Sequence, residues 1–392
     1  MRFRSVGLTA FAGLAIIVSA CTGSAGSPGV STPPDPCAGL TAGATHQLPA
    51  KSADYKIGVV ADIGSLTDKN FNEYTNKGAQ EGAAAIGAAV PAAVVPKSAS
   101  EYKQDIQAFI DQKYDVIITV GFNLAGATTC AAQKNPGIRF VGVDQSPICV
   151  DTTGKLDPTF GCKGAAKTLL PNYVSIAFKE DQAGYLAGIV AASVSKSGVI
   201  AAVGGTTLCA PCVRYIQGYE LGAKSVKPSI NVVTAYVTRD FSNAAFHDQA
   251  LGKTFAQNML ATNKTIDVIF QVAGETGNGV LDAACAANIW GIGVDVDQSI
   301  SYAADSKCIL TSAEKSLVLS VSSSLKALAA GTLTSGDDTW DAARDGIAVS
   351  DFHANSSQMT PALRKLLDDA FAAMKAGTLV TCPATGCGVG PK

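Results

Sequence analysis

The chain has 392 residues, of which 47% are hydrophobic and 16% are charged, and its formal net charge is −2 at pH 7. This length exceeds what a single hydrophobic core usually supports, so we expect about two domains. Lys and Arg are scattered along the chain, and without a basic patch the composition argues against binding to nucleic acid.

Residues 1–20 have the composition of a secretory signal. The basic residues of MRFRS precede the apolar run VGLTAFAGLAIIV, and small residues lead up to Cys21, which is the order found in signal peptides. The apolar run is short for a membrane span. Because a Cys directly after VSA resembles the bacterial lipobox, we expect Cys21 to be lipidated and to hold the protein on the outer side of the cell membrane.

Residues 21–53 predict a flexible tether. Their first part, TGSAGSPGVSTPPDP, is rich in Gly, Ser and Pro and poor in bulky residues. Such a segment cannot bury enough apolar surface to offset its chain entropy. We expect the tether to connect the lipid anchor to a domain outside the membrane.

The cysteines indicate an oxidising compartment. The chain has 11 of them, and an even number remains once Cys21 is set aside, as in a disulfide framework. The CAPC sequence at 209–212 also has the spacing of a thioredoxin-type redox motif, but no thioredoxin-like unit surrounds it. The sequence leaves the connectivity open. The short separations suggest the pairs Cys149–Cys162, Cys209–Cys212, Cys285–Cys308 and Cys382–Cys387, which would leave Cys37 for Cys130.

From residue 54 onward, apolar segments of strand length alternate with helical patterns. The hydrophobicity of these segments is continuous rather than alternating, which is typical of strands covered on both faces. Helical stretches such as residues 180–194 carry their apolar side chains on one stripe. The alternation predicts an α/β fold with parallel sheets. The expected strands are residues 56–61, 114–120, 138–143, 173–178, 198–204, 231–237, 267–273 and 290–296.

Two segments of the chain resemble each other. DVIITVGFNLAGATTC and DVIFQVAGETGNGVLDAAC each contain a strand, a glycine turn and a helix of small residues. Each leads to a second strand, after which Asp144 and Asp295 fall at matching places. Two similar α/β lobes explain this repeat. We expect an N-terminal lobe of residues 54–172 and 298–333, a C-terminal lobe of residues 173–297 and 334–376, and a tail, 377–392, that carries a disulfide.

Polar residues and glycines follow the expected strands. Ligands of open α/β sheets bind beyond the carboxyl ends of the strands, so two facing lobes would form a cleft there. The stretch after Val60 is longer and more polar than a strand-to-helix connection requires. We expect it to form one wall of the cleft, with Phe71 at the start of a helix capped by Thr67 or Asp68. The strand ends present Asp62, Gly121, Phe122, Asp144, Gly274 and Asp295.

Several segments are similar to those of a known family. In chain order they are VVADIGSLTDKNFNEYTNKGAQEG, YLAGIVAA, VGG followed by PCVRYIQGYELGAK, VIFQVAGETGNGVLDAA and IGVDVDQS. Over residues 56–324 they resemble the basic membrane lipoproteins, nucleoside-binding lipoproteins of ABC importers typified by the purine nucleoside receptor of spirochaetes. The resemblance implies an α/β, type I periplasmic-binding-protein fold, with two Rossmann-like lobes, parallel sheets and a multi-strand hinge.

The resemblance also implies how a nucleoside base is held. Phe71 in DKNFN would cover one face of the base and Phe270 in VIFQVAG the other. Tyr215, where the family usually has Phe, is a lesser candidate for stacking. Asp62 and Asn72 resemble the polar groups near the base.

The ribose would be bound by a second set of residues. Asp295 in GVDVDQ and Lys315 in TSAEKS resemble the pair that binds the ribose hydroxyls, and Gly274 would offer a backbone contact. A carboxylate can accept from two neighbouring hydroxyls in charge-assisted hydrogen bonds. The expected ligand-binding residues are Asp62, Phe71, Asn72, Gly121, Phe122, Asp144, Tyr215, Phe270, Gly274, Asp295 and Lys315.

The chain departs from the family in places. Residues 146–173 look longer than the corresponding family segment, the cysteines are many, and Cys212 stands where the family tends to have an aliphatic residue. These departures leave the choice between purine and pyrimidine open.

Each expected site residue also has a purely structural interpretation. Phe71 could be a core aromatic at a helix start, and Asp144 could cap the loop that follows it. Asp295 and Asp297 could be hinge caps, and Lys315 could be a solvated helix residue.

Three short segments resemble enzyme motifs, but none of them matches its motif in full. HDQALGKT ends like a phosphate-binding loop, but His247 stands where that loop needs its first Gly. SAEK has the S-x-x-K spacing of serine acyltransferases, but no K-T-G follows. GETGNG has its glycines in the wrong order for a dinucleotide fingerprint. The chain has 3 His residues, scattered in sequence, so we expect no metal site, no cofactor and no catalysis.

We therefore expect a monomeric, lipid-anchored, extracytoplasmic protein that captures a nucleoside and delivers it to an ABC permease. The same fold binding a sugar or another small metabolite is one alternative. A ligand-sensing surface lipoprotein without a transporter is another, and a redox enzyme that uses Cys209 and Cys212 is a third.

Overall fold

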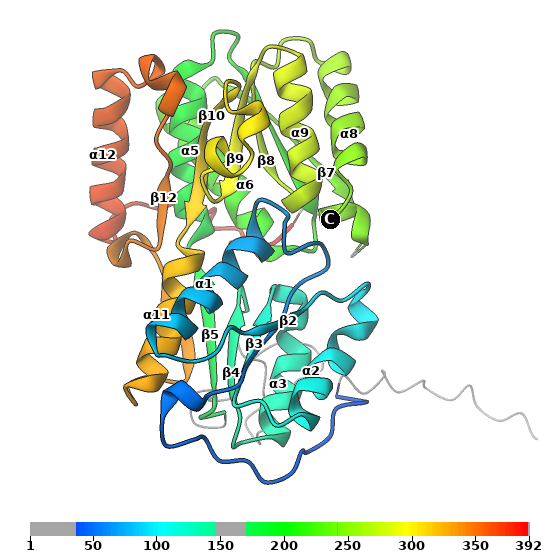
Figure 1. Ribbon diagram of the computed structural model, residues 1–392. Coiled ribbons are helices and arrows are strands. Elements are labelled where there is room, and N and C mark those ends of the chain that lie inside the picture. The colour runs from blue at the N-terminus through cyan, green and yellow to red at the C-terminus, as the bar shows by residue number, and fades with distance from the viewer. Residues whose placement is uncertain (1–36, 146–169, 241, 391–392) are drawn as a thin grey trace, which may run out of the picture. The chain divides into compact units, whose positions relative to one another are not determined.

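The computed structural model describes residues 37–145, 170–240 and 242–390. The expected signal peptide, Cys21 and the pair Cys149–Cys162 lie outside these residues. The described chain forms two α/β lobes, each built around a six-stranded sheet (Figure 1). This architecture confirms the predicted fold class.

The N-terminal lobe contains a fully parallel sheet with strand order β11-β5-β4-β3-β1-β2. Its strands are β1 (Ile57–Val60), β2 (Ala92–Val94), β3 (Val116–Val120), β4 (Arg139–Val143), β5 (Tyr173–Phe178) and β11 (Gly336–Trp340). Helices α1 (Phe71–Ala85) and α11 (Leu317–Ala329) cover one face, and α2 (Tyr102–Asp111) and α3 (Ala125–Lys134) cover the other. Val59 packs on the first face and Val60 on the second, so both faces need apolar residues and the strand reads as a continuous apolar run.

The C-terminal lobe contains a second sheet with the order β12-β10-β9-β8-β6-β7. Its strands are β6 (Val199–Thr206), β7 (Asn231–Thr238), β8 (Val268–Val272), β9 (Trp290–Asp295), β10 (Ile309–Lys315) and β12 (Ile347–Val349). All neighbours are parallel except β10 and β12. Helices α5 (Glu180–Val194), α6 (Ala210–Val226) and α12 (Pro361–Lys375) cover one face, and α8 (Gln249–Thr262) and α9 (Gly274–Ala286) cover the other.

Short helices complete the lobes. Two of them, α7 (Asn243–Phe246) and α10 (Gln298–Ser301), lie in loops that follow strands of the C-terminal lobe. The 3₁₀ segments are Ser52–Asp54, Ala99–Glu101, Phe122–Leu124, Ala303–Asp305, Ala342–Arg344 and the longer His353–Gln358, which is kinked at Asn355. No helix of the described residues is both long and apolar enough to cross a membrane.

The chain crosses between the two sheets three times. It leaves the N-terminal sheet after β5, returns to that lobe after β10, and leaves it again after β11. The expected lobe boundaries at 172, 297 and 333 therefore fall too early, since β5 and β11 pair in the first sheet and β10 pairs in the second. The crossings form the multi-strand hinge.

Helices α5 and α6 lie unusually close together. A Cβ atom on Gly222 of α6 would be 1.9 Å from the backbone oxygen of Tyr185, and one on Gly184 of α5 would be 2.0 Å from that of Tyr215. Only glycine allows the two backbones to approach this far.

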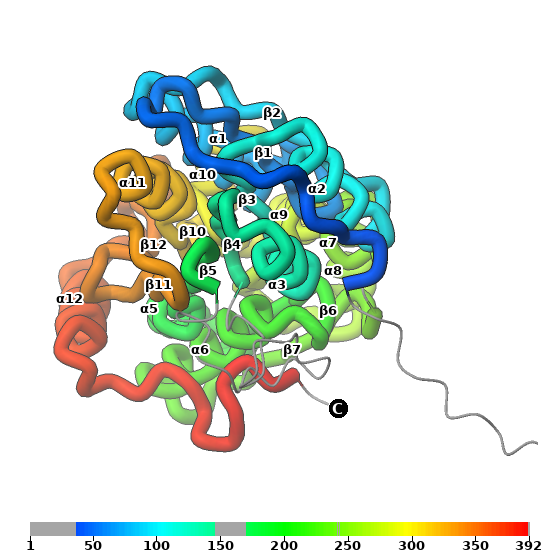
Figure 2. Tube along the Cα trace, turned by 90° about the horizontal axis from the view of Figure 1, so that it is seen from below, coloured from blue at the N-terminus to red at the C-terminus, as the bar shows by residue number. Residues whose placement is uncertain are grey.

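Residues 37–53 belong to the folded body, although we expected them in the tether. Cys37 forms a disulfide with Cys130 of α3, and Leu40 is only 2% exposed. His46 contacts Asp115 at 2.8 Å, and Asn135 accepts from the backbone N–H of Gly43. These contacts fasten the segment along the N-terminal lobe (Figure 2).

The structure contains the disulfides Cys209–Cys212, Cys285–Cys308 and Cys382–Cys387, which the short separations suggest, and Cys37–Cys130, the pair that they leave. The C-terminal tail runs back beside α6 (Figure 2). There Gln217 donates to the backbone oxygens of Gly386 and Val389 at 3.1 and 3.2 Å.

Candidate functional site

The polar stretch after β1 is a tight, self-bonded loop that starts α1. Both carboxylate oxygens of Asp68 accept backbone N–H groups, from Asn70 and Asn72 at 2.9 Å and from Glu73 at 3.1 Å. Asn70 holds the N-cap position of α1, and the carboxylate of Asp68, rather than the hydroxyl of Thr67, supplies the acceptors for its first turn. Burial raises the pKa of Asp68 to about 6, although these hydrogen bonds oppose the shift. The loop fixes Phe71 as the first residue of α1.

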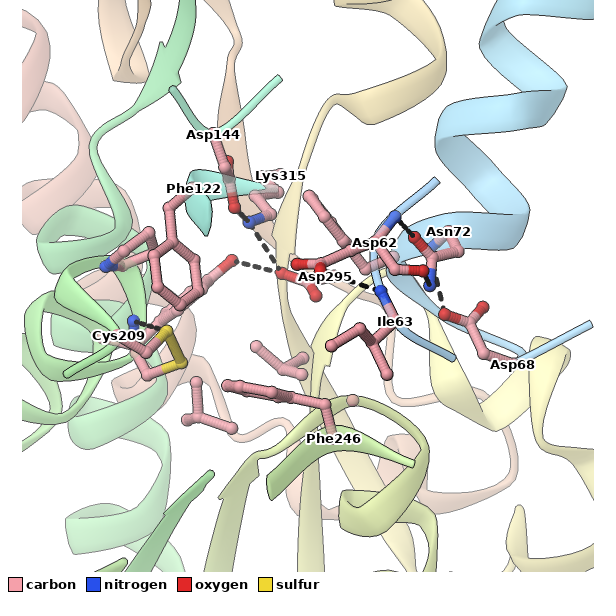
Figure 3. Close-up of a pocket in the computed structure, with 17 residues that line it drawn as sticks. Asp62, Ile63, Asp68, Asn72, Phe122, Asp144, Cys209, Phe246, Asp295 and Lys315 are labelled. Carbon is pink, nitrogen blue, oxygen red and sulfur yellow. Dashed lines mark hydrogen bonds and ion pairs between the residues drawn. A yellow bond between two sulfur atoms is a disulfide. The ribbon is translucent and has the colours of Figure 1, made fainter. Parts of the chain in front are cut away.

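A pocket lies where the carboxyl ends of the two sheets face each other, and both lobes line it (Figure 3). Of the residues expected from the sequence, the structure brings together Asp62, Phe71, Asn72, Phe122, Asp144, Tyr215, Gly274, Asp295 and Lys315. The lining also includes Ile63, Asp68, Cys209, Pro211, Cys212, Phe246, Val272 and Val294.

Phe270 and Gly121 do not line the pocket. Phe270 is 0% exposed in β8, and its ring centroid lies 5.1 Å from that of Tyr219 in the core. Gly121 acts indirectly: its φ is 97°, and a Cβ there would lie 2.2 Å from a carboxylate oxygen of Asp62. Gly121 thus leaves room for the Asp62 side chain.

Phe246 of α7, which the sequence analysis did not name, lines the pocket. In Figure 3 its ring lies below Ile63, and Phe122 lies across the pocket toward Cys209. The ring centroids of Phe122 and Phe246 are 6.4 Å apart in an edge-to-face arrangement. With Phe71, the pocket therefore contains three phenyl rings.

Lys315 joins carboxylates from both lobes. Its Nζ lies 2.5 Å from Oδ2 of Asp144, which follows β4, and 3.2 Å from Oδ1 of Asp295, which ends β9 (Figure 3). The same ammonium is 4.6 Å from the ring centroid of Phe71, within the range of a cation–π contact. Asp144 and Asp295 also share a left-handed backbone, with φ of 57° and 67°, so the sequence repeat places two equivalent acids around one lysine.

Burial dominates the electrostatics of this cluster. It raises the pKa of Asp144 to about 7 and also raises the pKa of Asp295, with the Lys315 ammonium opposing both shifts. Burial alone would lower the pKa of Lys315, but the two carboxylates outweigh it and hold that pKa above its usual value. Oδ1 of Asp144 is buried without a hydrogen-bond partner among the described residues. A bound ligand could donate to this atom.

Asp62 and Asn72 form a second polar group in the pocket lining. The backbone N–H of Asp62 donates to Oδ1 of Asn72 at 3.1 Å, while Tyr102 and the N–H of Ile63 donate to the Asp62 carboxylate. Burial raises the pKa of Asp62 to about 6, and these bonds oppose the shift. The arrangement presents acceptors and one amide donor to a ligand.

The N-terminal end of α6 forms a wall of the pocket. Cys209 and Cys212 are joined by a disulfide there, and Pro211 lies between them. One turn further on, the hydroxyl of Tyr215 donates to Asp295 Oδ1 at 3.3 Å. This wall thus positions one of the two acids.

The sequence comparisons identify the family. Residues 55–372 match the family model described as ABC transporter substrate-binding protein PnrA-like. The chain belongs to this family. The resemblance predicted from the sequence is thereby confirmed, and the family is one of substrate-binding proteins rather than enzymes.

Curated relatives include the ABC transporter nucleoside-binding protein BmpA of Lactococcus lactis, 31% identical over 62% of this chain and 65% of that protein. A CD4+ T-cell-stimulating antigen of Listeria innocua is 31% identical over 63% of this chain and 64% of that protein. Basic membrane protein D of Borreliella burgdorferi is 29% identical over 73% of this chain and 75% of that protein. The match thus spans less than two thirds of the first two relatives.

Solved structures share the fold at low sequence identity. A solute-binding protein of an ABC transporter system from Aeropyrum pernix is 21% identical, with a TM-score of 0.68 over 84% of this chain and 94% of that one. A periplasmic solute-binding protein from Actinobacillus succinogenes with bound D-allose is 15% identical, with a TM-score of 0.54 over 78% and 100%.

Proposed function

We propose that this protein is the extracytoplasmic, lipid-anchored receptor of an ABC importer, and that it captures a nucleoside, with a purine favoured, between its lobes. The observation that carries the proposal is the pocket itself. Phenyl rings, an acid–lysine–acid cluster and a separate amide–carboxylate pair occupy different parts of one cavity. A flat base and a polyhydroxylated pentose need these same three kinds of surface.

The acid–lysine cluster suits the ribose. Asp295 can accept from two neighbouring hydroxyls while Lys315 donates to their oxygens, and the free Oδ1 of Asp144 can accept from another donor. Each hydrogen bond to a charged group contributes about 1.5–3 kcal/mol.

The phenyl rings suit the base. Phe71 and Phe246 come from opposite lobes and both line the pocket, so we assign them to the two faces of the base, with Phe122 at its edge. Stacking contributes about 1–3 kcal/mol per aromatic contact. Together with the ribose bonds, these contacts must supply more than the roughly 8 kcal/mol net of a micromolar complex, because the cost of association is subtracted from their sum.

Delivery to a permease, attachment through Cys21 and a monomeric state are parts of the same proposal. Membership of an ABC transporter family supports the first of these and the extracytoplasmic location. The Lactococcus lactis relative is named as a nucleoside-binding protein, which supports the ligand class.

Calorimetry on the detergent-solubilised full chain tests the ligand class. Adenosine should bind with micromolar or tighter affinity, and ribose and adenine more weakly. Asp295→Ala should weaken adenosine at least tenfold and adenine little. Asp297→Ala is the matched control, because Asp297 caps α10 and contacts His353 outside this pocket. Tight binding of a free sugar without any response to nucleosides would instead establish the sugar alternative.

A further inference from the structure

The two lobes also meet through side chains that do not line the pocket. Nδ2 of Asn278, in α9 of the C-terminal lobe, donates to the backbone oxygen of Asp68 at 3.1 Å. Oγ of Ser301, in α10, donates to the backbone oxygen of Lys69 at 2.7 Å. The acceptors are consecutive carbonyls of the loop that precedes α1, and Lys69 has a φ of 62°.

The C-terminal lobe holds the Asn278 amide in one orientation. Oε1 of Gln298 accepts from the N–H of Val294 at 3.0 Å, so its Nε2 must be the group that faces Asn278. This Nε2 donates to Oδ1 of Asn278 at 2.9 Å. Nδ2 of Asn278 is therefore the atom directed at the other lobe, and the residue is only 2% exposed.

The loop that carries these two carbonyls also positions side chains that line the pocket. The Asp68 carboxylate ties the N–H groups of residues 70, 72 and 73 into one unit, and Phe71 and Asn72 of this unit line the pocket. A bond to the Asp68 carbonyl consequently fixes the position of Phe71 relative to the C-terminal lobe.

We propose that Asn278 and Ser301 are positioning residues that latch the lobes together over the ligand without touching it. The inference rests on the proposed function, because it takes the ligand to lie in the pocket. A latch of this kind acts only on the equilibrium between separated and joined lobes. It should therefore change the affinity of every ligand by the same factor and act through the dissociation rate.

The variant Asn278→Asp removes the bond between the lobes and, when ionised, adds a carboxylate that repels the Asp68 carbonyl. It keeps the side-chain size and the acceptor for Gln298 Nε2, and it replaces the donor facing the Asp68 carbonyl by an oxygen. Adenosine and adenine should both dissociate at least about three- to tenfold faster, the range that the loss of one hydrogen bond supplies. Ser301→Ala should give the same direction of change. Ser299→Ala is the matched control in the same helix, because its hydroxyl bonds Asp297 at 2.6 Å within one lobe.

Stopped-flow dissociation and amide hydrogen exchange separate the outcomes. If no nucleoside binds the unmodified chain, the proposed function fails. Amide hydrogen exchange then still tests the latch, because the amides of residues 70–73 should exchange faster in Asn278→Asp and Ser301→Ala than in Ser299→Ala. Unchanged dissociation in both latch variants overturns the latch. Unequal factors for adenosine and adenine overturn it as well, since they would make Asn278 a ligand contact.

Discussion

Replacing Lys315 by Met should destabilise the protein, because the lysine compensates the repulsion between Asp144 of one lobe and Asp295 of the other. Its side chain is 3% exposed, and those of Asp144 and Asp295 are 6% and 10% exposed. Removing one partner of a buried ion pair costs about 3–5 kcal/mol, because the remaining charge is buried without compensation. We expect a loss of this size in the free energy of unfolding at pH 8.

The loss should shrink in acid. The pKa of Asp144 is already raised to about 7 with the ammonium present, and it rises further without it. The folded variant then holds a proton that the unfolded chain, with an ordinary Asp pKa of 3.8, releases. The free energy of unfolding of the variant must therefore fall as pH rises from the unfolded-state pKa of Asp144 to its folded-state pKa. The slope is up to about 1.4 kcal/mol per pH unit for one proton.

Urea unfolding at pH 5.5 and pH 8, followed by tryptophan fluorescence, measures both effects. Adding Asp144→Asn to Lys315→Met should recover most of the stability lost at pH 8. Lys326→Met, at an exposed position of α11, is the control and should change little. An equal loss at both pH values would refute the reasoning, because it would show that packing and not charge accounts for the effect.

Further outcomes follow from the same structure. Adenosine affinity should fall as pH drops from 8 to 6, because the raised pKa of Asp144 leaves part of the free protein protonated at that carboxyl. Calorimetry at pH 6.5 should therefore detect proton release on binding. An affinity that does not change with pH would contradict this. Gly222→Ala should destabilise the fold by about 1–3 kcal/mol through overpacking against α5, whereas Glu220→Ala should not, as thermal unfolding will show. Replacing Cys37 and Cys130 by Ser should cost about 2–5 kcal/mol in denaturant unfolding, since the disulfide closes a sequence separation of 93.

The sequence predicted the strands that read as continuous apolar runs, and it missed those that are short or partly polar. Each expected strand overlaps a strand of the structure. In an α/β protein, short continuous apolar runs such as VIITV usually form strands of the buried sheet. The missed strands are β2 and β12, with three residues each, and β10 and β11, whose sequences ILTSAEK and GDDTW are partly polar. Missing β10 and β11 displaced the lobe boundaries, since these strands lead into two of the crossings.

The positions of the expected strand ends predicted the aspartates of the pocket, but they did not predict all of its phenylalanines. Asp62, Asp144 and Asp295 follow buried strands, and topology alone brings such positions to one edge. Phe270 lies inside a strand whose faces are both buried, so its sequence context could not show which side it faces. Phe246 lies in a four-residue helix, α7, within SNAAFHD, where no periodic pattern marks it.

The covalent bond between Cys37 and Cys130 decides how the protein responds to a pull on its N-terminal segment. Tension that arrives at residue 37 enters α3 directly and is borne by the N-terminal lobe. None of the three hinge crossings lies on that route. A force applied at this end of the described chain therefore bypasses the three crossings between the lobes.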